Sequence, residues 1–184
     1  MPLPTPHTVA VIGAGAAGLV AIRELRREGL KAVVFEQQRK IGGTWVYNPS
    51  TESDPLGLDP ARTVIHSSIY ASLRTNLPRE VMGFWDYPLV TKKGPHRDPR
   101  RFPGHWEVLE YLKDFTTEFG LSESVRFGAE VRRVGLEGGK WKIRSRMCGE
   151  EFVEVYDAVV VCNGHYTEPR IAEIPGKVPV YSNN

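Results

Sequence analysis

The sequence has little of what marks several common classes of protein. Among its 184 residues are two cysteines, Cys148 and Cys162, which are too few for a disulfide framework and lack C-x-x-C spacing. Its five histidines are scattered, with neither the spacing of metal ligands nor a Ser-His-Asp arrangement. No apolar run reaches the roughly eighteen residues that would span a bilayer. We therefore expect no metal site and no membrane span, and we expect a protein of the reducing cytoplasm.

An excess of charge of one sign is also lacking. The formal net charge is +2, which predicts neither a nucleic-acid surface nor an acidic partner. The uncharged run of residues 9–22 resembles the apolar core of a signal peptide. We do not interpret it as one, because no basic segment precedes it and its glycines fit a nucleotide-binding turn. Length and composition are those of an ordinary globular protein with one core, and they leave the oligomeric state open.

The chain is organised around a glycine-rich turn near its start. Residues 9–12 predict a buried strand, and Gly13, Gly15 and Gly18 follow at G-x-G-x-x-G spacing before a helical segment. The first glycine permits a tight turn, the second lets a pyrophosphate approach the backbone, and the third lets helix and strand pack closely. The phosphates would lie on free N–H groups at the start of the helix. The residues that form this predicted site are Gly13, Ala14, Gly15, Ala16, Ala17 and Gly18.

An acidic residue follows at the distance that such a turn requires. Glu36 ends the second expected strand, residues 32–35, eighteen residues after the last glycine. Its carboxylate can accept hydrogen bonds from both hydroxyls of an adenosine ribose and would repel a 2′-phosphate. The turn therefore predicts a dinucleotide with a free ribose. The glycines alone leave NAD and FAD both open, and a glycine turn without any ligand is the simpler alternative.

The rest of the chain predicts an α/β fold of the Rossmann-like, FAD/NAD(P)-binding kind. Residues 106–119 carry apolar side chains at helical spacing and end at Gly120. Residues 129–156 predict an antiparallel β-meander with a Gly138-Gly139 turn, and residues 158–162 are a continuous apolar run typical of a buried parallel strand. We expect that run to lie beside the first strand, in a parallel sheet with the meander on one side.

The middle of the chain predicts a loop and one short helix. Residues 41–45, I-G-G-T-W, predict a loop whose glycines let backbone N–H groups approach a ligand. Tyr70, Leu73 and Leu77 share one face of an expected helix that Pro78 ends. An asparagine before Leu-Pro is more often a helix cap than a reactive group. The stretch 81–102 has no periodicity, and we assign no element to it.

Five motifs fall in an order that identifies a family resemblance. They are G-A-G-A-A-G at 13–18, Glu36, G-G-T-W at 42–45, Y-x-x-L-x-T-N-L-P at 70–78 and D-A-V-V-V-C-N-G-H-Y at 157–166. Together they resemble the flavin-containing monooxygenases, most closely the plant S-oxygenating branch, over residues 8–176. In that family NADPH reduces FAD, and O₂ then forms a C4a-hydroperoxide that oxygenates the sulfur or nitrogen of a soft nucleophile.

The resemblance also implies roles for individual residues. The glycine turn would hold the FAD pyrophosphate and Glu36 the ribose. Asn76 would be the catalytic residue, because the family asparagine at this position helps to hold the oxygenated flavin. The remaining implied contacts are Gly43, Thr44 and Trp45 on the flavin side, Thr75 beside Asn76 near the flavin and nicotinamide, the Val131 backbone at the adenine, and Gly164 at the sheet end.

The resemblance ends near residue 176. The family continues into an F-x-G-x-x-x-H-x-x-x-Y signature and a second glycine motif for NADP, whereas this sequence reads K-V-P-V-Y-S-N-N and has no second G-x-G-x-x-G. We therefore expect a loose arm at 1–7, an incomplete FAD-binding domain at 8–176 and a divergent tail at 177–184. The NADPH-binding domain would be absent, and the 184-residue polypeptide inactive alone.

Two alternatives compete with this interpretation. A non-catalytic FAD-binding fragment, or a regulatory remnant of the enzyme, remains open. A disulfide reductase is disfavoured, because those enzymes place a redox cysteine directly after G-G-T, where this chain has Trp45.

Overall fold

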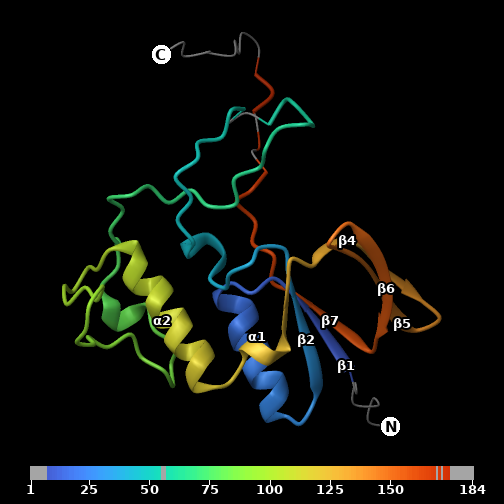
Figure 1. Ribbon diagram of the computed structural model, residues 1–184, viewed down its shortest axis with the longest axis horizontal. Helices are drawn as coiled ribbons and strands as arrows, with labels where there is room; N and C mark the ends of the chain where they lie inside the picture. The colour runs from blue at the N-terminus through green and yellow to red at the C-terminus, as the bar shows by residue number, and fades with distance from the viewer. Residues whose placement is uncertain (1–7, 55–56, 169, 171, 175–184) are drawn as a thin grey trace.

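The computed structural model describes residues 8–54, 57–168, 170 and 172–174 (Figure 1). The predicted arm at 1–7 and tail at 177–184 lie outside these residues. In chain order the elements are β1 (Thr8–Ile12), α1 (Ala16–Arg27), β2 (Lys31–Glu36), η1 (Gly43–Trp45), η2 (Arg79–Val81), α2 (His105–Glu118), η3 (Ser122–Ser124), β3 (Val125–Phe127), β4 (Glu130–Glu137), β5 (Lys140–Met147), β6 (Glu150–Tyr156) and β7 (Ala158–Val161).

A four-stranded parallel sheet, in the order β3-β2-β1-β7, forms the centre of the molecule. Ala10 pairs with Val33 on one side and with Val159 on the other, so the apolar run near the C-terminal end does lie beside the first strand. Val9, Ala10 and Val11 are almost completely buried, as expected of a strand covered on both faces. The predicted parallel sheet is therefore confirmed.

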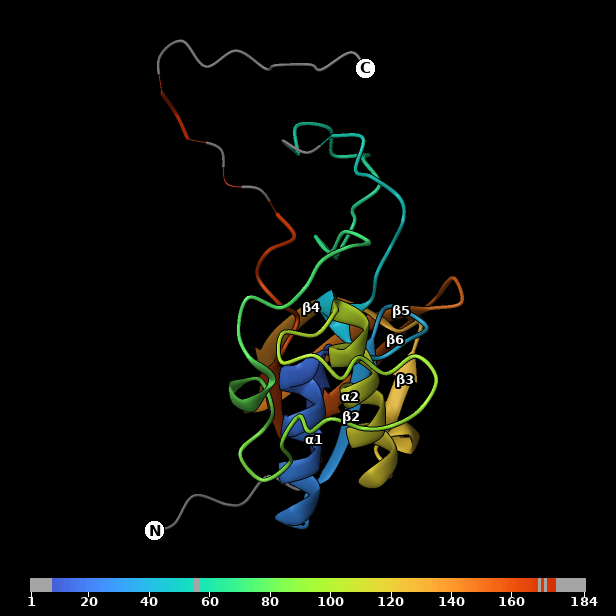
Figure 2. The same cartoon turned by 90° about the vertical axis from the view of Figure 1, so that its left-hand side faces the viewer.

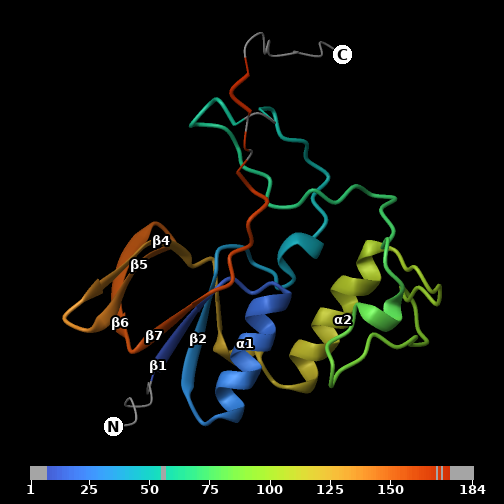
Figure 3. The same ribbon diagram turned by 180° about the vertical axis from the view of Figure 1, so that it is seen from behind.

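The second sheet is the predicted antiparallel meander, in the order β4-β5-β6. Gly138 and Gly139 make its first hairpin turn with φ values of 57° and 77°, a conformation that side chains disfavour. The meander covers one side of the parallel sheet, and the two helices cover the other (Figures 1 and 3). Ile143 and Tyr156 of the meander pack against Phe35 of β2 in a small buried core. The predicted α/β class with a β-meander is confirmed.

The larger core lies between the helices and the sheet. The apolar faces of α1 and α2 contribute Leu19, Ile22, Leu112 and Phe115, all fully or almost fully buried. Figure 2 shows the two helices side by side across the sheet, both running in the same direction. Both helices begin at the end where the parallel strands finish, so their positive dipole ends point to one edge of the molecule.

The helix expected around Tyr70, Leu73 and Leu77 is wrong. This segment consists of turns and irregular backbone, and Tyr70 and Leu77 are 61% and 52% exposed. Its backbone groups are used elsewhere, because Arg74 forms an antiparallel bridge with Gly104 and the Thr75 N–H donates to the Pro103 carbonyl at 2.9 Å. Partners distant in sequence thus replace the local bonds of a helix. Within the described ranges, no helix is both long and apolar enough to cross a membrane.

Candidate cofactor site

The glycine turn lies where β1 ends, between the ends of β2 and β7. Gly13 has φ +98°, and its N–H donates to the Phe35 carbonyl at 2.8 Å. A Cβ placed on Gly13 would lie 2.5 Å from the Cys162 carbonyl oxygen, and a Cβ on Gly18 would overlap the Gly13 carbonyl. Only glycine fits at these two positions, because backbone occupies the space that a side chain would need.

Gly15 is different, because the space around it is open on one side. It precedes α1 with φ −75° and ψ −174°, an extended backbone that any residue can adopt. A Cβ there would meet only the backbone of Gly43, at 3.6 Å. In the part of the chain that the structure describes, no side chain caps α1 and no acid lies in its first turn, which Ala16 and Ala17 open. The helix therefore presents uncompensated N–H groups and the positive end of its dipole, an arrangement that suits an anion.

The G-G-T-W segment packs directly against this turn. The Gly42 N–H donates to the Ala14 carbonyl at 2.9 Å, and a Cβ on Gly43 would lie 3.0 Å from the Gly15 Cα. Trp45 is half-buried against the larger core, and Thr44 is exposed. Two glycine segments that are distant in sequence thus meet backbone to backbone at the start of α1.

Glu36 is fixed onto the glycine turn by both of its oxygens. Oε2 accepts the Ala14 N–H at 2.7 Å, and Oε1 accepts the Gln38 N–H at 2.8 Å. The residue is 6% exposed, yet each carboxylate oxygen keeps a second lone pair that can accept a hydroxyl. Sequence reasoning assigned Glu36 to a ribose and missed the bond to Ala14, which had no signal in the spacing.

Val131 lies on the strand that leaves this edge of the sheet. The Ala129 N–H donates to the Glu36 carbonyl at 3.0 Å, which joins the end of β2 to the start of β4. The ladder between β4 and β5 is irregular just after Val131, which is half-buried. A hollow of about 380 Å³ is lined in part by Gln38 and by Glu130, the residue before Val131. The predicted adenine position is therefore close to the predicted ribose position.

Thr75 and Asn76 reach the same edge from the irregular middle of the chain. Thr75 is buried and its hydroxyl donates to the Leu77 carbonyl at 2.9 Å, while Asn76 is exposed. Among the described residues, Asn76 makes no hydrogen bond with the glycine turn. The start of α2 connects this segment with the glycine turn. The His105 N–H donates to the Leu73 carbonyl, and α2 also contacts η1 of the G-G-T-W segment.

Gly164 follows the end of β7, close to the turn. The Cys162 N–H donates to the Ile12 carbonyl at 2.8 Å, so the chain leaves the sheet beside Gly13. Gly164 itself is exposed with φ +76°, and a Cβ there would meet nothing within 4 Å. The structure brings it to the predicted edge of the sheet without packing it against the turn.

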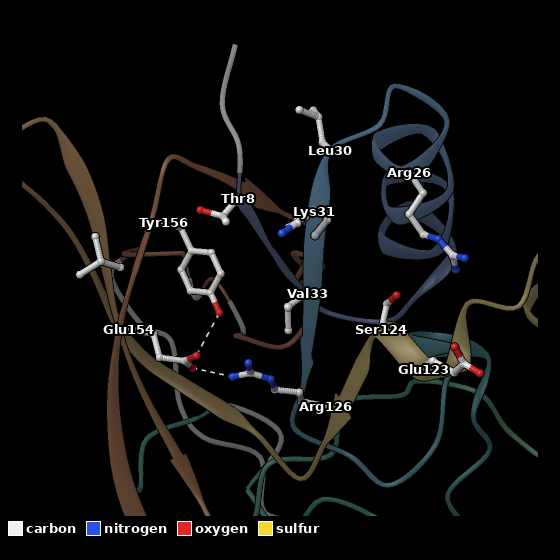
Figure 4. Close-up of a pocket in the computed structure, with 12 residues that line it drawn as sticks. Thr8, Arg26, Leu30, Lys31, Val33, Glu123, Ser124, Arg126, Glu154 and Tyr156 are labelled. Atoms are coloured by element: carbon white, nitrogen blue, oxygen red, sulfur yellow. Dashed lines mark hydrogen bonds and ion pairs between the residues drawn. The ribbon is translucent and has the colours of Figure 1, made fainter. Parts of the chain in front are cut away.

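A hollow of about 560 Å³ lies at the opposite end of the sheet (Figure 4). Thr8 and Lys31, the first residues of β1 and β2, line it, together with the ion pair between Arg126 and Glu154 at 2.6 Å. None of the predicted cofactor residues lines it. Over the described ranges, no group of three or more acidic, histidine or cysteine side chains is arranged to hold a metal ion.

Comparison with known proteins places the sequence among flavin enzymes. Residues 6–177 match the family described as flavin-binding monooxygenase-like. The flavin-containing monooxygenases FMO GS-OX-like 3 and FMO GS-OX4 of Arabidopsis thaliana are 60% and 58% identical to it, over 92% and 95% of this chain and 39% of each relative. The structure of S-allyl-L-cysteine S-oxygenase from Allium sativum is similar with a TM-score of 0.87 and 60% identity, over 92% of this chain and 39% of the other. The chain thus spans about two fifths of the length of these relatives.

Proposed function

Because this chain belongs to the flavin-binding monooxygenase-like family, we propose that it forms the FAD-binding part of an oxygenase, with the cofactor held on the glycine turn. The observation that carries the proposal is the uncapped start of α1, packed backbone to backbone against Gly43 and bordered by the Glu36 carboxylate. An NAD site has no need of the second glycine segment, whereas Gly43, packed against Gly15, would lie beside the flavin part of a bound FAD.

Each part of FAD has a counterpart among the residues present. The first-turn N–H groups of α1, beside Gly15, would donate hydrogen bonds to the pyrophosphate. The remaining lone pairs of Glu36 would accept the ribose hydroxyls, and the Val131 backbone would meet the adenine. These contacts fit a free 2′-hydroxyl, because the fixed carboxylate of Glu36 would repel a phosphate there.

Bound FAD would supply the electron transfer to O₂ that oxygenation needs, and the protein's residues then bind, orient and shield. Gly43, Thr44 and Trp45 line the flavin side. Thr75 holds the backbone around Asn76, the proposed catalytic residue, whose amide can both donate to and accept from the flavin edge. Gly164 would close the end of the sheet beside the cofactor.

The substrate is proposed to be a small molecule with a thioether sulfur, since a similar protein is an S-allyl-L-cysteine S-oxygenase. An amine is the second candidate, because sulfur and nitrogen are both soft nucleophiles. NADPH would be the reductant and O₂ the oxidant. We place this work in the cytoplasm, which is compatible with the free thiols of Cys148 and Cys162.

The experiment measures FAD bound to the purified 184-residue polypeptide by absorbance and by fluorescence quenching. Gly15→Val should abolish retention, because the side chain fills the space that the pyrophosphate needs. The matched control is Gly135→Val in β4, where a Cβ meets nothing within 4 Å and a β-branched residue suits the strand. The proposal fails if the wild-type polypeptide binds no FAD, or if Gly15→Val retains as much FAD as Gly135→Val.

A further inference from the structure

Three charged residues are buried between the start of α2 and the irregular segment that carries Asn76. Arg79, Asp98 and Glu107, which we name the buried ionic cluster, are 6%, 4% and 0% exposed. Burying charges is costly, and well-packed apolar residues often serve stability as well or better. The cluster therefore calls for an explanation other than stability.

Arg79 binds its own segment to the loop that precedes α2, residues 98–104. Its backbone N–H donates to the Arg101 carbonyl at 2.9 Å. Its Nε donates to the Arg100 carbonyl at 3.0 Å, and its Nη2 donates to the Arg100 carbonyl at 2.9 Å and to the Asp98 carbonyl. One guanidinium group thus satisfies carbonyl oxygens that no regular secondary structure would pair, and the planar fork of arginine fixes their relative positions.

Asp98 and Glu107 fix the same loop onto the start of α2. The Asp98 N–H donates to Glu107 Oε2 at 3.0 Å, and Asp98 Oδ2 accepts the Gly104 N–H at 2.8 Å. Arg100 donates to both Asp98 oxygens, at 2.7 and 2.6 Å, and this pairing holds the pKa of the Asp98 carboxyl well below its usual range. Acidic side chains therefore bind N–H groups at both ends of the loop, and Arg79 binds its carbonyl groups.

The loop in turn holds the backbone on both sides of Asn76. Before it, the Thr75 N–H donates to the Pro103 carbonyl and the Leu73 carbonyl accepts the His105 N–H, at 2.9 and 3.1 Å. After it, Arg79 makes the bonds described above. Asn76 itself is exposed and its side chain makes no hydrogen bond to the described residues, so these flanking backbone anchors help to set where it lies.

The pair at the centre of the cluster is held by charge rather than by a direct hydrogen bond. Arg79 Nη1 and Glu107 Oε1 are 3.7 Å apart, and both atoms are buried without a hydrogen-bond partner in the part of the chain that the structure describes. Arg97 Nη1 lies 4.0 Å from the same oxygen. Removing the charge of Glu107 would leave Arg79 buried and uncompensated, which should loosen the anchor after Asn76.

We propose that Arg79 and Glu107 are positioning residues that hold Asn76 in place at the flavin site. The inference rests on the proposed function, because Asn76 is placed near the flavin only there. Neither residue contacts the cofactor in this proposal. They act through the loop, and their loss should therefore imitate the loss of Asn76.

The test is a double-mutant cycle on FAD binding, made with the whole 184-residue chain. Asn76→Ala should weaken FAD binding by about fivefold, the effect of one neutral hydrogen bond. Glu107→Gln keeps an acceptor for the Asp98 N–H, removes the charge, and should weaken binding by a similar factor. The double variant should be no weaker than either single one. Glu110→Gln, which removes a half-buried α2 carboxylate paired with Lys113, is the matched control and should change nothing.

A second readout needs no cofactor. Hydrogen exchange of the Thr75 and Arg79 amides should be at least tenfold faster in Glu107→Gln than in Glu110→Gln, because these amides donate to the loop. Arg79→Lys replaces Glu107→Gln in both experiments if the latter does not fold. Multiplicative effects in the cycle, or unchanged exchange, overturn the proposal. If the wild-type chain binds no FAD, the proposed function fails. Hydrogen exchange of the Thr75 and Arg79 amides then decides by itself whether the buried ionic cluster fixes the backbone around Asn76.

Discussion

Two alanine substitutions in the glycine turn should separate folding from cofactor binding. In Gly18→Ala the new Cβ overlaps the Gly13 carbonyl oxygen and lies 3.0 Å from its carbon, inside the distance that real Cβ contacts keep. That carbonyl cannot move freely, since the Gly13 N–H bonds Phe35 and Gly13 is itself pressed against Cys162. Overpacking of this kind typically costs about 1–3 kcal/mol, and we expect the upper end or more.

Gly15→Ala should leave the free energy of unfolding within about 1 kcal/mol of the wild type. Its Cβ makes an ordinary contact of 3.6 Å with Gly43. The loss of glycine at the start of α1 and the lower entropy of the unfolded chain act in opposite directions, each by about 1 kcal/mol or less. The methyl group nevertheless stands where the pyrophosphate must approach. If one charge-assisted hydrogen bond to the pyrophosphate is lost, the binding free energy falls by about 1.5–3 kcal/mol, and FAD binds at least tenfold more weakly.

Urea unfolding of the cofactor-free protein and titration with FAD together measure both effects. Gly18→Ala should shift the urea midpoint strongly. Gly15→Ala should keep the midpoint and lose affinity. The reasoning is refuted if Gly15→Ala destabilises the cofactor-free protein as much as Gly18→Ala, or if it binds FAD like the wild type.

Three further predictions concern other parts of the molecule. Glu36→Ala should weaken FAD binding at least tenfold and also lower the urea midpoint, because the Ala14 N–H loses its acceptor; unchanged affinity would show that the ribose is held elsewhere. Burial raises the pKa of Tyr111 to about 12, so the free energy of unfolding should fall as pH rises from about 10 to 12, and Tyr111→Phe should flatten that fall in denaturation curves measured at each pH. Given FAD, NADPH, O₂ and a methyl thioether, the 184-residue polypeptide should form no sulfoxide, because its one G-x-G-x-x-G motif is assigned to FAD. Oxygen uptake at an electrode and analysis of the product test this, and stoichiometric sulfoxide would contradict it.

The sequence predicted the parts of the fold that rest on local patterns. The glycine turn, the apolar strands and the Gly138-Gly139 hairpin each have a spacing that few other structures share, and all of them are found. The helix at 106–119 is found within one residue at each end, at His105–Glu118.

What the sequence could not predict depends on partners far along the chain. The segment around Thr75 looked helical because its apolar spacing was helical, yet its backbone bonds with Pro103. The stretch 81–102 had no pattern, because separate contacts and not periodic burial hold it. Leu89 packs into the larger core, the Phe84 N–H donates to the Tyr111 hydroxyl, and Asp98 pairs with Arg100. Glu36 was assigned to a ligand from its position after β2, but nothing in the spacing revealed its bond to Ala14.

The pairing of β1 with β7 has a consequence for how the protein is made. Asp157, directly before β7, accepts a hydrogen bond from Thr8 across 149 positions of sequence. At about 5–20 residues per second, a ribosome needs roughly 8–30 s to synthesise that interval. Until then the apolar edge of β1 has a partner only in β2, and the Cys162 carbonyl is not yet beside Gly13. We therefore expect the nascent chain to depend on chaperones during this interval and to acquire its cofactor only after synthesis has passed β7.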